Sequence, residues 1–367
     1  MVSKKIKHIE GRLVDHPKIK FSRGKEISFF YNNNVIKGIE GESIAASLYA
    51  SGQRIFSRSF KLHRPRGLLC VSGKCPNCMM RVNGIPNIRT CVEPVRNGIH
   101  VNHQNAWPSL TRDILSIVDR FSSKIHSGFQ YRNFTNNKLF WPLLERILRI
   151  FSGIGRIPDI KFTNPQSKYK PEVLEVDIAV IGGGPSGMKA AITSSLSGAK
   201  VVLVDDNNNL GGELLLHTNK LDNPEEYVGT RGCDLISELV EVIKRDKRIR
   251  IITKSTIFGY YNGALGVFGP NGLTLIHPKG IVVSTGSYEN LISFNNNDLP
   301  GIFLSRGLLR LLHIYGIIPG KEIVIFTEED RGYDVAFYLI DAGIKVKAII
   351  DNRRTSNLNH LTSDRLQ

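Results

Sequence analysis

The first hundred residues carry short apolar runs separated by turn residues, a pattern typical of paired strands. The segments EISFFY (26–31) and VIKGI (35–39) enclose an asparagine-rich turn and predict two strands. The next segment, GESIAASLYASG (41–52), predicts a short helix with Ser43 as its N-cap and Gly52 as its stop. The chain therefore begins with two strands and a helix.

Apolar residues at helical spacing predict two helices further along, in NAWPSLTRDILSIVDRF (105–121) and FWPLLERILRIF (140–151). Their tryptophans, Trp107 and Trp141, are expected to anchor these helices in a core. The stretch that follows, 152–173, is rich in glycine, proline and polar residues and predicts a linker.

Four of the five cysteines lie in one region, which begins with GLLCVSGKCPNCMM (67–80). Three are spaced C-x4-C-x2-C and the fourth follows after twelve residues, which is the plant-type ferredoxin arrangement for a [2Fe–2S] cluster. Thiolates are soft donors, and Gly73 gives the loop the freedom to wrap over sulfides and aim N–H groups at them. A hairpin at Asn83-Gly84 can return the fourth cysteine to the others. The expected cluster ligands are Cys70, Cys75, Cys78 and Cys91.

Zinc and disulfides are the alternatives for this cysteine group. Structural zinc sites usually carry paired C-x2-C knuckles, and only one is present here. Disulfides are not expected in a chain without an export signal. Cys233 stands alone in RGCDL and is expected to be a buried, small apolar residue.

A glycine-rich turn follows an apolar strand in VDIAVIGGGPSGMKAAITSSLSGAKVVLVDD (176–206). Gly182, Gly184 and Gly187 have Rossmann spacing within a strand–helix–strand context. They are expected to make the tight turn, admit the pyrophosphate and allow close helix packing. The helix N-terminus offers N–H groups to the anion, and Asp205 lies where an acid would hold ribose hydroxyls. FAD and NAD share this fingerprint, so the motif alone does not choose between them.

Two further segments favour a flavoprotein-type domain. NLGGEL (209–214) can bring a glycine loop onto the phosphates or the flavin edge, and GIVVSTGSYEN (280–290) resembles the ATG segment of two-dinucleotide flavoproteins. The expected cofactor-binding residues are Gly182, Gly184, Pro185, Ser186, Gly187, Asp205, Asp206, Gly211, Gly212, Thr285 and Gly286.

A third strand–helix–strand pattern spans 321–351 and turns at TEEDRG. Its acids stand where phosphates would sit and would repel them, so we expect this unit to be structural. The predicted fold is α/β and α+β: a β-grasp [2Fe–2S] ferredoxin-like module, a helical connector and a Rossmann-type domain with the start of a second, inserted βαβ domain. The predicted domain ranges are 1–102, 103–172, 173–320 and 321–367, in that order.

The net charge of +16 allows nucleic acid, an acidic membrane surface or an acidic protein as partners. No nucleic-acid-binding motif is visible, so no nucleic-acid partner is expected. No apolar run reaches eighteen residues and no signal peptide is visible, so we expect no membrane span and a cytoplasmic location.

The densest basic segment, RIFSRSFKLHRPRG (54–67), precedes the cysteines. Its cations can bind a flavin phosphate or an acidic partner. The favoured interpretation is that they contact a neighbouring domain or solvent, and that His63 is structural. The cations in question are Arg58, Lys61, Arg64 and Arg66.

Taken together, these segments resemble the α subunit of heterotetrameric sarcosine oxidase, with opine oxidases and hydroxyproline dehydrogenases as relatives. The resemblance rests on residues 41–67, NAWPSLTRDI, the glycine loop and FNNNDLPGIFLSRGLLRLLHIYGIIPGKEIVIF. It departs in two ways. The four cysteines, which sarcosine oxidases of this kind look to have lost, are kept here, and that favours the dehydrogenase relatives. The chain also stops at Gln367 while family members continue, so another polypeptide is expected to complete its C-terminal half; a truncated gene product and a shorter fold are the alternatives.

The resemblance implies an electron-transfer and dinucleotide-binding subunit of a secondary-amine or imino-acid dehydrogenase or oxidase, with sarcosine, proline, hydroxyproline or an opine as substrate. A flavoprotein β-type subunit would carry the amine site in a hetero-oligomer, since no catalytic residue for substrate chemistry is found here. The expected cofactors are a [2Fe–2S] cluster, FAD with NAD as the alternative, and an FMN at a subunit interface as a further candidate. The alternative functions are an NAD(P)H-dependent flavin/iron–sulfur reductase and a non-catalytic scaffold subunit.

Overall fold

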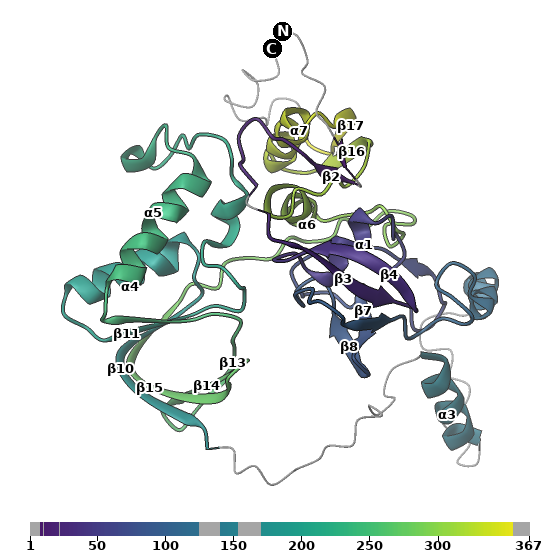
Figure 1. Ribbon diagram of the computed structural model, residues 1–367, viewed down its shortest axis with the longest axis horizontal. Coiled ribbons are helices and arrows are strands. Elements are labelled where there is room, and N and C mark those ends of the chain that lie inside the picture. Colours follow the sequence, from purple (N-terminus) through teal and green to yellow (C-terminus); the bar gives the residue numbers. More distant parts are fainter. Residues whose placement is uncertain (1–7, 10, 22, 125–139, 153–169, 355–367) are drawn as a thin grey trace. The chain divides into compact units, whose positions relative to one another are not determined.

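The computed structural model describes residues 8–9, 11–21, 23–124, 140–152 and 170–354. The chain forms two compact units, Met1–Phe162 with Asn290–Gln367, and Thr163–Glu289. Each unit is described by itself below (Figure 1). The domain limits expected at residues 102, 172 and 320 stay predictions.

A five-stranded sheet in the order β4-β3-β9-β7-β8 forms the centre of the first unit. Strand β3 pairs antiparallel with β4 and parallel with β9, and β7 pairs antiparallel with both β9 and β8. Helix α1 (Ile44–Ala50) contacts β4 and is buried along its whole length. The strands are β3 (Glu26–Tyr31), β4 (Asn34–Ile39), β7 (Met79–Val82), β8 (Ile85–Arg89) and β9 (His100–Asn102).

The turns and caps of this sheet follow the sequence prediction. Asn32 and Asn33 have φ of 45° and 69°, so the first hairpin turns through two left-handed residues. The Asn83-Gly84 turn has φ of 47° and 82° and joins β7 to β8. The Ser43 side chain accepts a hydrogen bond from the N–H of Ala46 and caps α1.

Two short strand pairs complete the first half of this unit. Strand β2 (Arg12–Leu13) is held by Arg12, whose guanidinium makes two 2.8 Å bonds to the buried Glu42 carboxylate. Glu42 also accepts a hydrogen bond from Ser47 Oγ at 2.6 Å, so its charge is fully partnered. The pairs are β1 (His8–Ile9) with β2 (Arg12–Leu13) and β5 (Ser57–Arg58) with β6 (Pro65–Arg66).

The connector contains both predicted helices, one of them shortened. Helix α3 spans Phe140–Ser152, as predicted. Of the helix predicted over 105–121, the structure has only η1, a 3-10 helix over Ile114–Lys124. Asp113 Oδ1 accepts bonds from the N–H groups of Trp107 and Leu115, and these bonds shape residues 107–113 as a loop. The core position expected for Trp107 is therefore wrong, since its side chain is 64% exposed.

The last part of the described chain belongs to the first unit. Leu311 and Ile317 lie in the same hydrophobic core as the residues of the five-stranded sheet. The expected strand–helix–strand unit is present, with β16 and β17 parallel. In its acidic turn, Asp330 pairs with Arg353 at 2.9 Å, which agrees with a structural role. The elements are α6 (Ser305–Leu309), η4 (Arg310–Ile314), β16 (Glu322–Thr327), α7 (Arg331–Asp341) and β17 (Lys345–Asp351).

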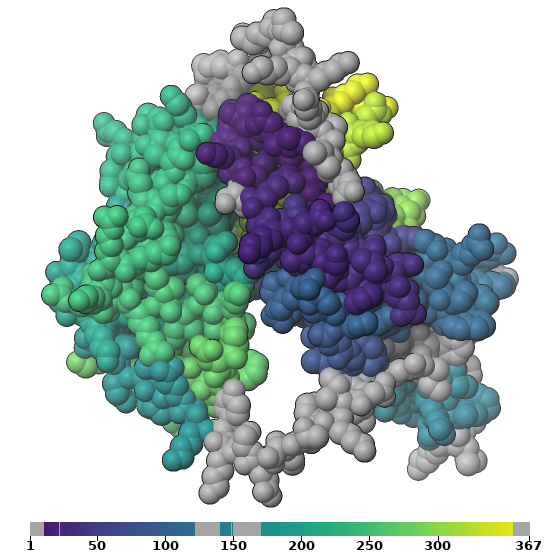
Figure 2. Space-filling model, viewed as in Figure 1, coloured from purple at the N-terminus to yellow at the C-terminus, as the bar shows by residue number. Residues whose placement is uncertain are grey.

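The second unit is built on a six-stranded sheet in the order β12-β11-β10-β15-β14-β13. The first four strands pair in parallel, and β14 pairs antiparallel with both β15 and β13. Its teal and green residues form one compact body in the space-filling view (Figure 2). Its strands are β10 (Glu172–Ile181), β11 (Val201–Val204), β12 (Ile249–Ile252), β13 (Thr256–Tyr261), β14 (Ala264–Gly269) and β15 (Gly272–Val283).

Among the described residues of this unit, two α-helices and two short 3-10 helices accompany the sheet. They are α4 (Pro185–Leu196), η2 (Gly212–Leu216), η3 (Glu225–Tyr227) and α5 (Gly232–Arg245). Parallel strands joined through α4 confirm the Rossmann-type fold, and the sheet of the first unit confirms the ferredoxin-like module. Within the part of the chain that the structure describes, no helix is long and apolar enough to traverse a bilayer.

Candidate cofactor sites

The cysteine loop lies between β6 and β7 and gathers four sulfur atoms. Cys70 Sγ and Cys75 Sγ are 3.3 Å apart. Cys91, which follows β8, reaches back within hydrogen-bond distance of both Cys70 and Cys78. Three of the four side chains are buried, and Cys75 is half-buried. The structure thus brings together the four residues that the spacing predicts as ligands.

Backbone N–H groups point at these sulfurs. Gly73 N–H donates to Cys91 Sγ at 3.2 Å, and the N–H groups of Ser72 and Lys74 donate to Cys70. Gly73 has a φ of 72°, a left-handed conformation that glycine adopts without strain. Amide donors around sulfur stabilise negative charge, as required around an iron–sulfur cluster.

The crowded thiols share their protons unequally. The neighbouring thiols of Cys75 and Cys91 hold the pKa of Cys70 well below its usual range. The thiols of Cys70 and Cys78 raise the pKa of Cys91, and burial adds to this effect. Because metal binding requires thiolates, loading this set releases protons and becomes weaker at low pH.

The donor set fits two irons. All four donors are thiols, and sets of four cysteine thiolates hold [2Fe–2S] clusters. In the part of the chain that the structure describes, no three His, Cys, Asp or Glu side chains surround a position for a single metal ion. Cys70, Cys75, Cys78 and Cys91 would hold such a cluster together, since the loop brings Cys70 Sγ within 3.3 Å of Cys75 Sγ and the N–H of Gly73 within 3.2 Å of Cys91 Sγ.

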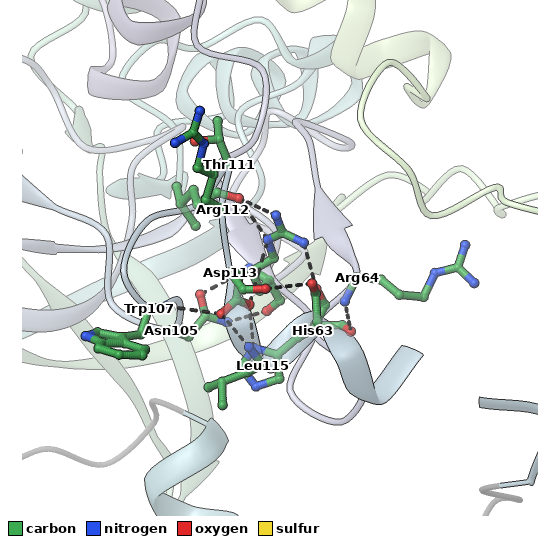
Figure 3. Close-up of polar contacts among 12 residues, drawn as sticks. His63, Arg64, Asn105, Trp107, Thr111, Arg112, Asp113 and Leu115 are labelled. Carbon is green, nitrogen blue, oxygen red and sulfur yellow. Dashed lines mark hydrogen bonds and ion pairs between the residues drawn. The ribbon is translucent and has the colours of Figure 1, made fainter. Parts of the chain in front are cut away.

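The basic segment before the cysteines is engaged in the protein's own structure (Figure 3). Arg58 is buried, donates to the carbonyl oxygens of Leu110 and His63, and lies 3.9 Å from Asp113. His63 Nδ1 is 2.8 Å from Asp113 Oδ2, and both side chains are buried. Arg64 pairs with Asp298 at 3.0 Å. These contacts agree with the favoured structural interpretation of this segment.

The glycine turn of the second unit joins β10 to α4. Gly182 has a φ of 103°, and a side chain there would collide with the carbonyl of Ser284. Gly187, in the first turn of α4, packs against the carbonyl of Gly182, so no side chain fits between helix and strand. Gly184 is the N-cap of α4 and has open space around it. A pyrophosphate can therefore approach the N-terminus of α4.

The two acids after β11 have different surroundings. Asp205 is buried, and its Oδ2 accepts the N–H of Gly183 at 2.6 Å while its Oδ1 accepts the N–H of Asn207 at 2.7 Å. Both oxygens of Asp205 thus hold the backbone of the site. Asp206 is exposed and lies next in the chain, and its Oδ1 accepts a bond from Asn207 Nδ2 at 2.9 Å. The ribose role expected of Asp205 stays a prediction, because a carboxylate oxygen that accepts one N–H can still accept a bond from a hydroxyl.

The remaining predicted residues gather around the same turn. Gly211 N–H donates to the carbonyl of Gly183 at 2.7 Å, and a side chain on Gly212 would touch Gly184 Cα at 3.0 Å. Thr285 and Gly286 follow β15, whose carboxyl end adjoins that of β10. The loop after Asp205 and the segment after β15 therefore both meet the glycine turn, as the sequence predicts.

Two family models match the chain over these same regions. Residues 24–106 match a 2Fe-2S iron-sulfur cluster binding domain. Residues 177–251 match an FAD dependent oxidoreductase. The first range contains all four gathered cysteines, and the second contains the glycine turn and both acids. The chain therefore carries domains of both kinds.

Whole-chain comparisons extend the likeness beyond these two domains. The alpha subunit of sarcosine oxidase from Rhizobium meliloti is 30% identical over 94% of this chain. The chain is related to the sarcosine oxidase alpha subunits along nearly its whole length. It spans about a third of that relative's own length, 36%.

Two further relatives agree with this family. One of the opine oxidase subunits of Agrobacterium tumefaciens is 26% identical over 49% of the chain and 37% of that relative. The crystal structure of L-proline dehydrogenase from P. horikoshii superposes with a TM-score of 0.67 at 20% identity, and covers 91% of this chain and 55% of the other. That likeness shows the shared fold.

The chain, which is related to the sarcosine oxidase alpha subunits, contains two residues at the glycine turn that motif spacing does not reveal. Gly183 gives its N–H to Asp205, and a side chain on Gly183 would overlap Leu210. Ser284 Oγ donates to the carbonyls of Ile181 and Gly182, both at 3.0 Å. The run of three glycines and the serine before Thr285 were the available signals, but their roles depend on contacts between distant segments.

Proposed function

We propose that this chain is the electron-transfer and dinucleotide-binding subunit of a secondary-amine or imino-acid dehydrogenase or oxidase. One observation carries the proposal: a relative of the sarcosine oxidase alpha subunits combines a four-thiol loop lined with amide donors and a glycine turn built for a dinucleotide. When bound, FAD supplies two-electron hydride chemistry and a [2Fe–2S] cluster supplies one-electron transfer.

In the first unit, Cys70, Cys75, Cys78 and Cys91 would hold the cluster. The N–H groups of Ser72, Gly73 and Lys74 would stabilise its negative charge, because they already point at the cysteine sulfurs. The burial of three of these cysteines would keep water away from the sulfurs.

In the second unit, the glycine turn would bind the pyrophosphate of FAD. The N–H groups at the start of α4 face the position of the anion, and Pro185 sits at the first helical position, where an N–H is not needed. Asp205, with Asp206 beside it, would hold the ribose, and Asp205 also keeps the turn in shape through Gly183. The FAD-type family model favours FAD over NAD in this site.

The substrate site would lie on a flavoprotein β-type subunit, with an FMN at the interface as a further candidate. The names of the relatives support this assembly, since two of them are subunits of sarcosine and opine oxidases. The exposed face of β16 and β17 supports a further polypeptide beside the C-terminal part. Val324 and Ile350 there are 55% and 53% exposed, whereas parallel strands are normally covered on both faces.

Anaerobic native purification with cofactor extraction tests the proposal. We expect two irons and two sulfides per chain, extractable FAD, a companion flavoprotein and a paramagnetic signal after dithionite reduction. Sarcosine, proline, hydroxyproline and an opine are then added to the complex. Flavin bleaching by one of them in the complex, and not in the isolated chain, supports the proposal. An iron-free, colourless chain would contradict it.

The same samples separate the alternative functions. Bleaching of the isolated chain by NADH would point to an NAD(P)H-dependent reductase. A cluster that stays oxidised with every donor would point to a scaffold role. Either result would overturn the proposed role in amine oxidation while leaving the cofactor content established.

A further inference from the structure

Residues 296–307, which we call the clasp, contact the cysteine loop from more than two hundred positions along the chain. We propose that the clasp positions the main chain at Cys70 and thereby tunes the cluster. This inference rests on the proposed role of Cys70 as a cluster ligand. The contacts all lie within the first unit, where α6 packs beside the ferredoxin-like module (Figure 1).

The clasp begins with a charged contact to the strand that enters the loop. Asp298 Oδ2 is 2.5 Å from Arg66 Nη1, and Asp298 Oδ1 is 3.0 Å from Arg64 Nη2. Arg66 also donates to the backbone carbonyl of Asp298 at 3.1 Å, and Arg64 donates to Asn296 Oδ1 at 2.8 Å. One carboxylate thus fixes two arginines, one on β6 and one just before it.

Backbone contacts continue along the next residues. A side chain on Gly67 would stand 2.7 Å from Pro300 Cα, so the two main chains touch there. Leu304 N–H donates to the carbonyl of Leu69 at 3.1 Å. Contacts of this kind fix the direction of the chain immediately before the first cysteine.

The closest contact is at Gly307, in α6. A side chain there would overlap the Leu69 carbonyl oxygen and stand 3.0 Å from both the carbonyl carbon and oxygen of Cys70. These neighbours are backbone atoms, so they cannot rotate away as a side chain could. Gly307 is therefore the position at which α6 sets the Leu69–Cys70 peptide.

The hydrophobic core next to the clasp restricts movement of α6 and so maintains the contact between Gly307 and the Leu69–Cys70 peptide. Leu311 and Ile317 are fully buried among core residues that include Val71, Cys78 and Cys91. Displacement of α6 would have to disturb this packing. An added side chain at Gly307 should therefore move the cysteine loop as well as the helix.

Movement of the loop has a defined electronic consequence. Gly73, in the same loop, donates its N–H to Cys91 Sγ at 3.2 Å, and N–H donors to sulfur stabilise the more negative, reduced cluster. If the Leu69–Cys70 peptide is pushed, the loop shifts and N–H bonds of this kind lengthen. The reduction potential of the cluster should then fall, while the four ligands remain the same.

The test compares Gly307→Ala with Gly320→Ala in the full chain, after anaerobic loading with iron and sulfide. Gly320 is the matched control, because its added side chain would meet only ordinary contacts at 3.9 Å. We expect both variants to hold two irons per chain. Gly307→Ala should show shifted g-values, a lower reduction potential and faster iron loss to a chelator, whereas Gly320→Ala should match the original chain.

Asp298→Asn provides a second variant if Gly307→Ala does not fold. It keeps the size of the side chain, removes the charge that holds Arg64 and Arg66, and should shift the same signals in the same direction by a smaller amount. If the original chain loads a cluster and the variants show unchanged spectra and reduction potential, the proposal about the clasp is overturned and the ligand assignment stands. If the original chain takes up no iron, the ligand assignment on which the clasp rests is overturned.

Discussion

Replacement of Gly187 by alanine tests whether the packing of α4 on β10 shapes the dinucleotide site. The added Cβ would overlap the carbonyl oxygen of Gly182 and stand 2.6 Å from Ser284 Oγ and 3.1 Å from the Gly182 carbonyl carbon. Ser284 can move only by giving up its two 3.0 Å bonds to backbone carbonyls. Relief must therefore come from a shift of α4 away from the strand.

The expected cost follows from overpacking a close contact. Inserting a methyl group into a well-packed position costs about 1–3 kcal/mol. If FAD binds only when α4 lies in its original position, binding must push the helix back against the added methyl group, and the binding free energy falls by this cost. At about 1.4 kcal/mol for each factor of ten, the affinity for FAD should fall by roughly 5- to 150-fold.

Titration of the apoprotein with FAD, followed by flavin fluorescence quenching, measures this effect. Gly184→Ala is the informative companion, because the space around Gly184 is open and its φ of −73° suits alanine. We expect Gly184→Ala to keep the thermal stability and still weaken binding, since it places a methyl group where the pyrophosphate approaches. Gly187→Ala with unchanged affinity and unchanged melting temperature would refute the reasoning.

Three further predictions concern the first unit. Cys75→Ser should lower the iron content after reconstitution, whereas Cys233→Ser should leave it unchanged; equal iron in both variants would exclude Cys75 as a ligand. Glu42→Gln should destabilise the protein by about 3–5 kcal/mol in urea denaturation, because it leaves the buried charge of Arg12 without its partner; a loss below about 1 kcal/mol would contradict this. Burial lowers the pKa of His16 below its ordinary 6.5, so its contribution to stability should be lost as pH falls from 6.5 towards the lower folded-state pKa. Urea denaturation between pH 7 and 5 should show this slope, His16→Gln should reduce it, and an equal slope in the two proteins would argue against His16 as its source.

Much of the local structure could be predicted because it depends on neighbouring residues. The asparagine turns, the Ser43 cap and the strand–helix–strand pattern are set by backbone preferences that a few adjacent residues express. The cysteine spacing is equally local, and a single hairpin returns Cys91 to the others. The match of residues 24–106 to an iron–sulfur cluster binding domain agrees with that prediction.

The predictions were weakest where a side chain's partner lies far along the chain. Trp107 was expected in the core from helical spacing, but the Asp113 carboxylate bonds its N–H and forms a loop instead. A ligand was the alternative for the arginines before the cysteines, and the sequence does not reveal that Asp298 pairs with Arg64 and Arg66. Periodicity describes which face is apolar and does not reveal which distant acid neutralises a cation.

Asp205 shows the same limit inside a recognised motif. Its position at the end of β11 indicates an acid for the ribose, but the motif does not reveal that its oxygens also accept the N–H groups of Gly183 and Asn207. At the cysteine loop, likewise, the residues that would bind the cluster are local, whereas Gly307 and Asp298, which hold the loop, come from the far end of the chain. At both sites, contacts that hold the backbone in place are added to the residues that are predicted to bind. A substitution in residues 296–307 should therefore be interpreted first through its effect on the cysteine loop, although the predicted ligands all lie outside that segment.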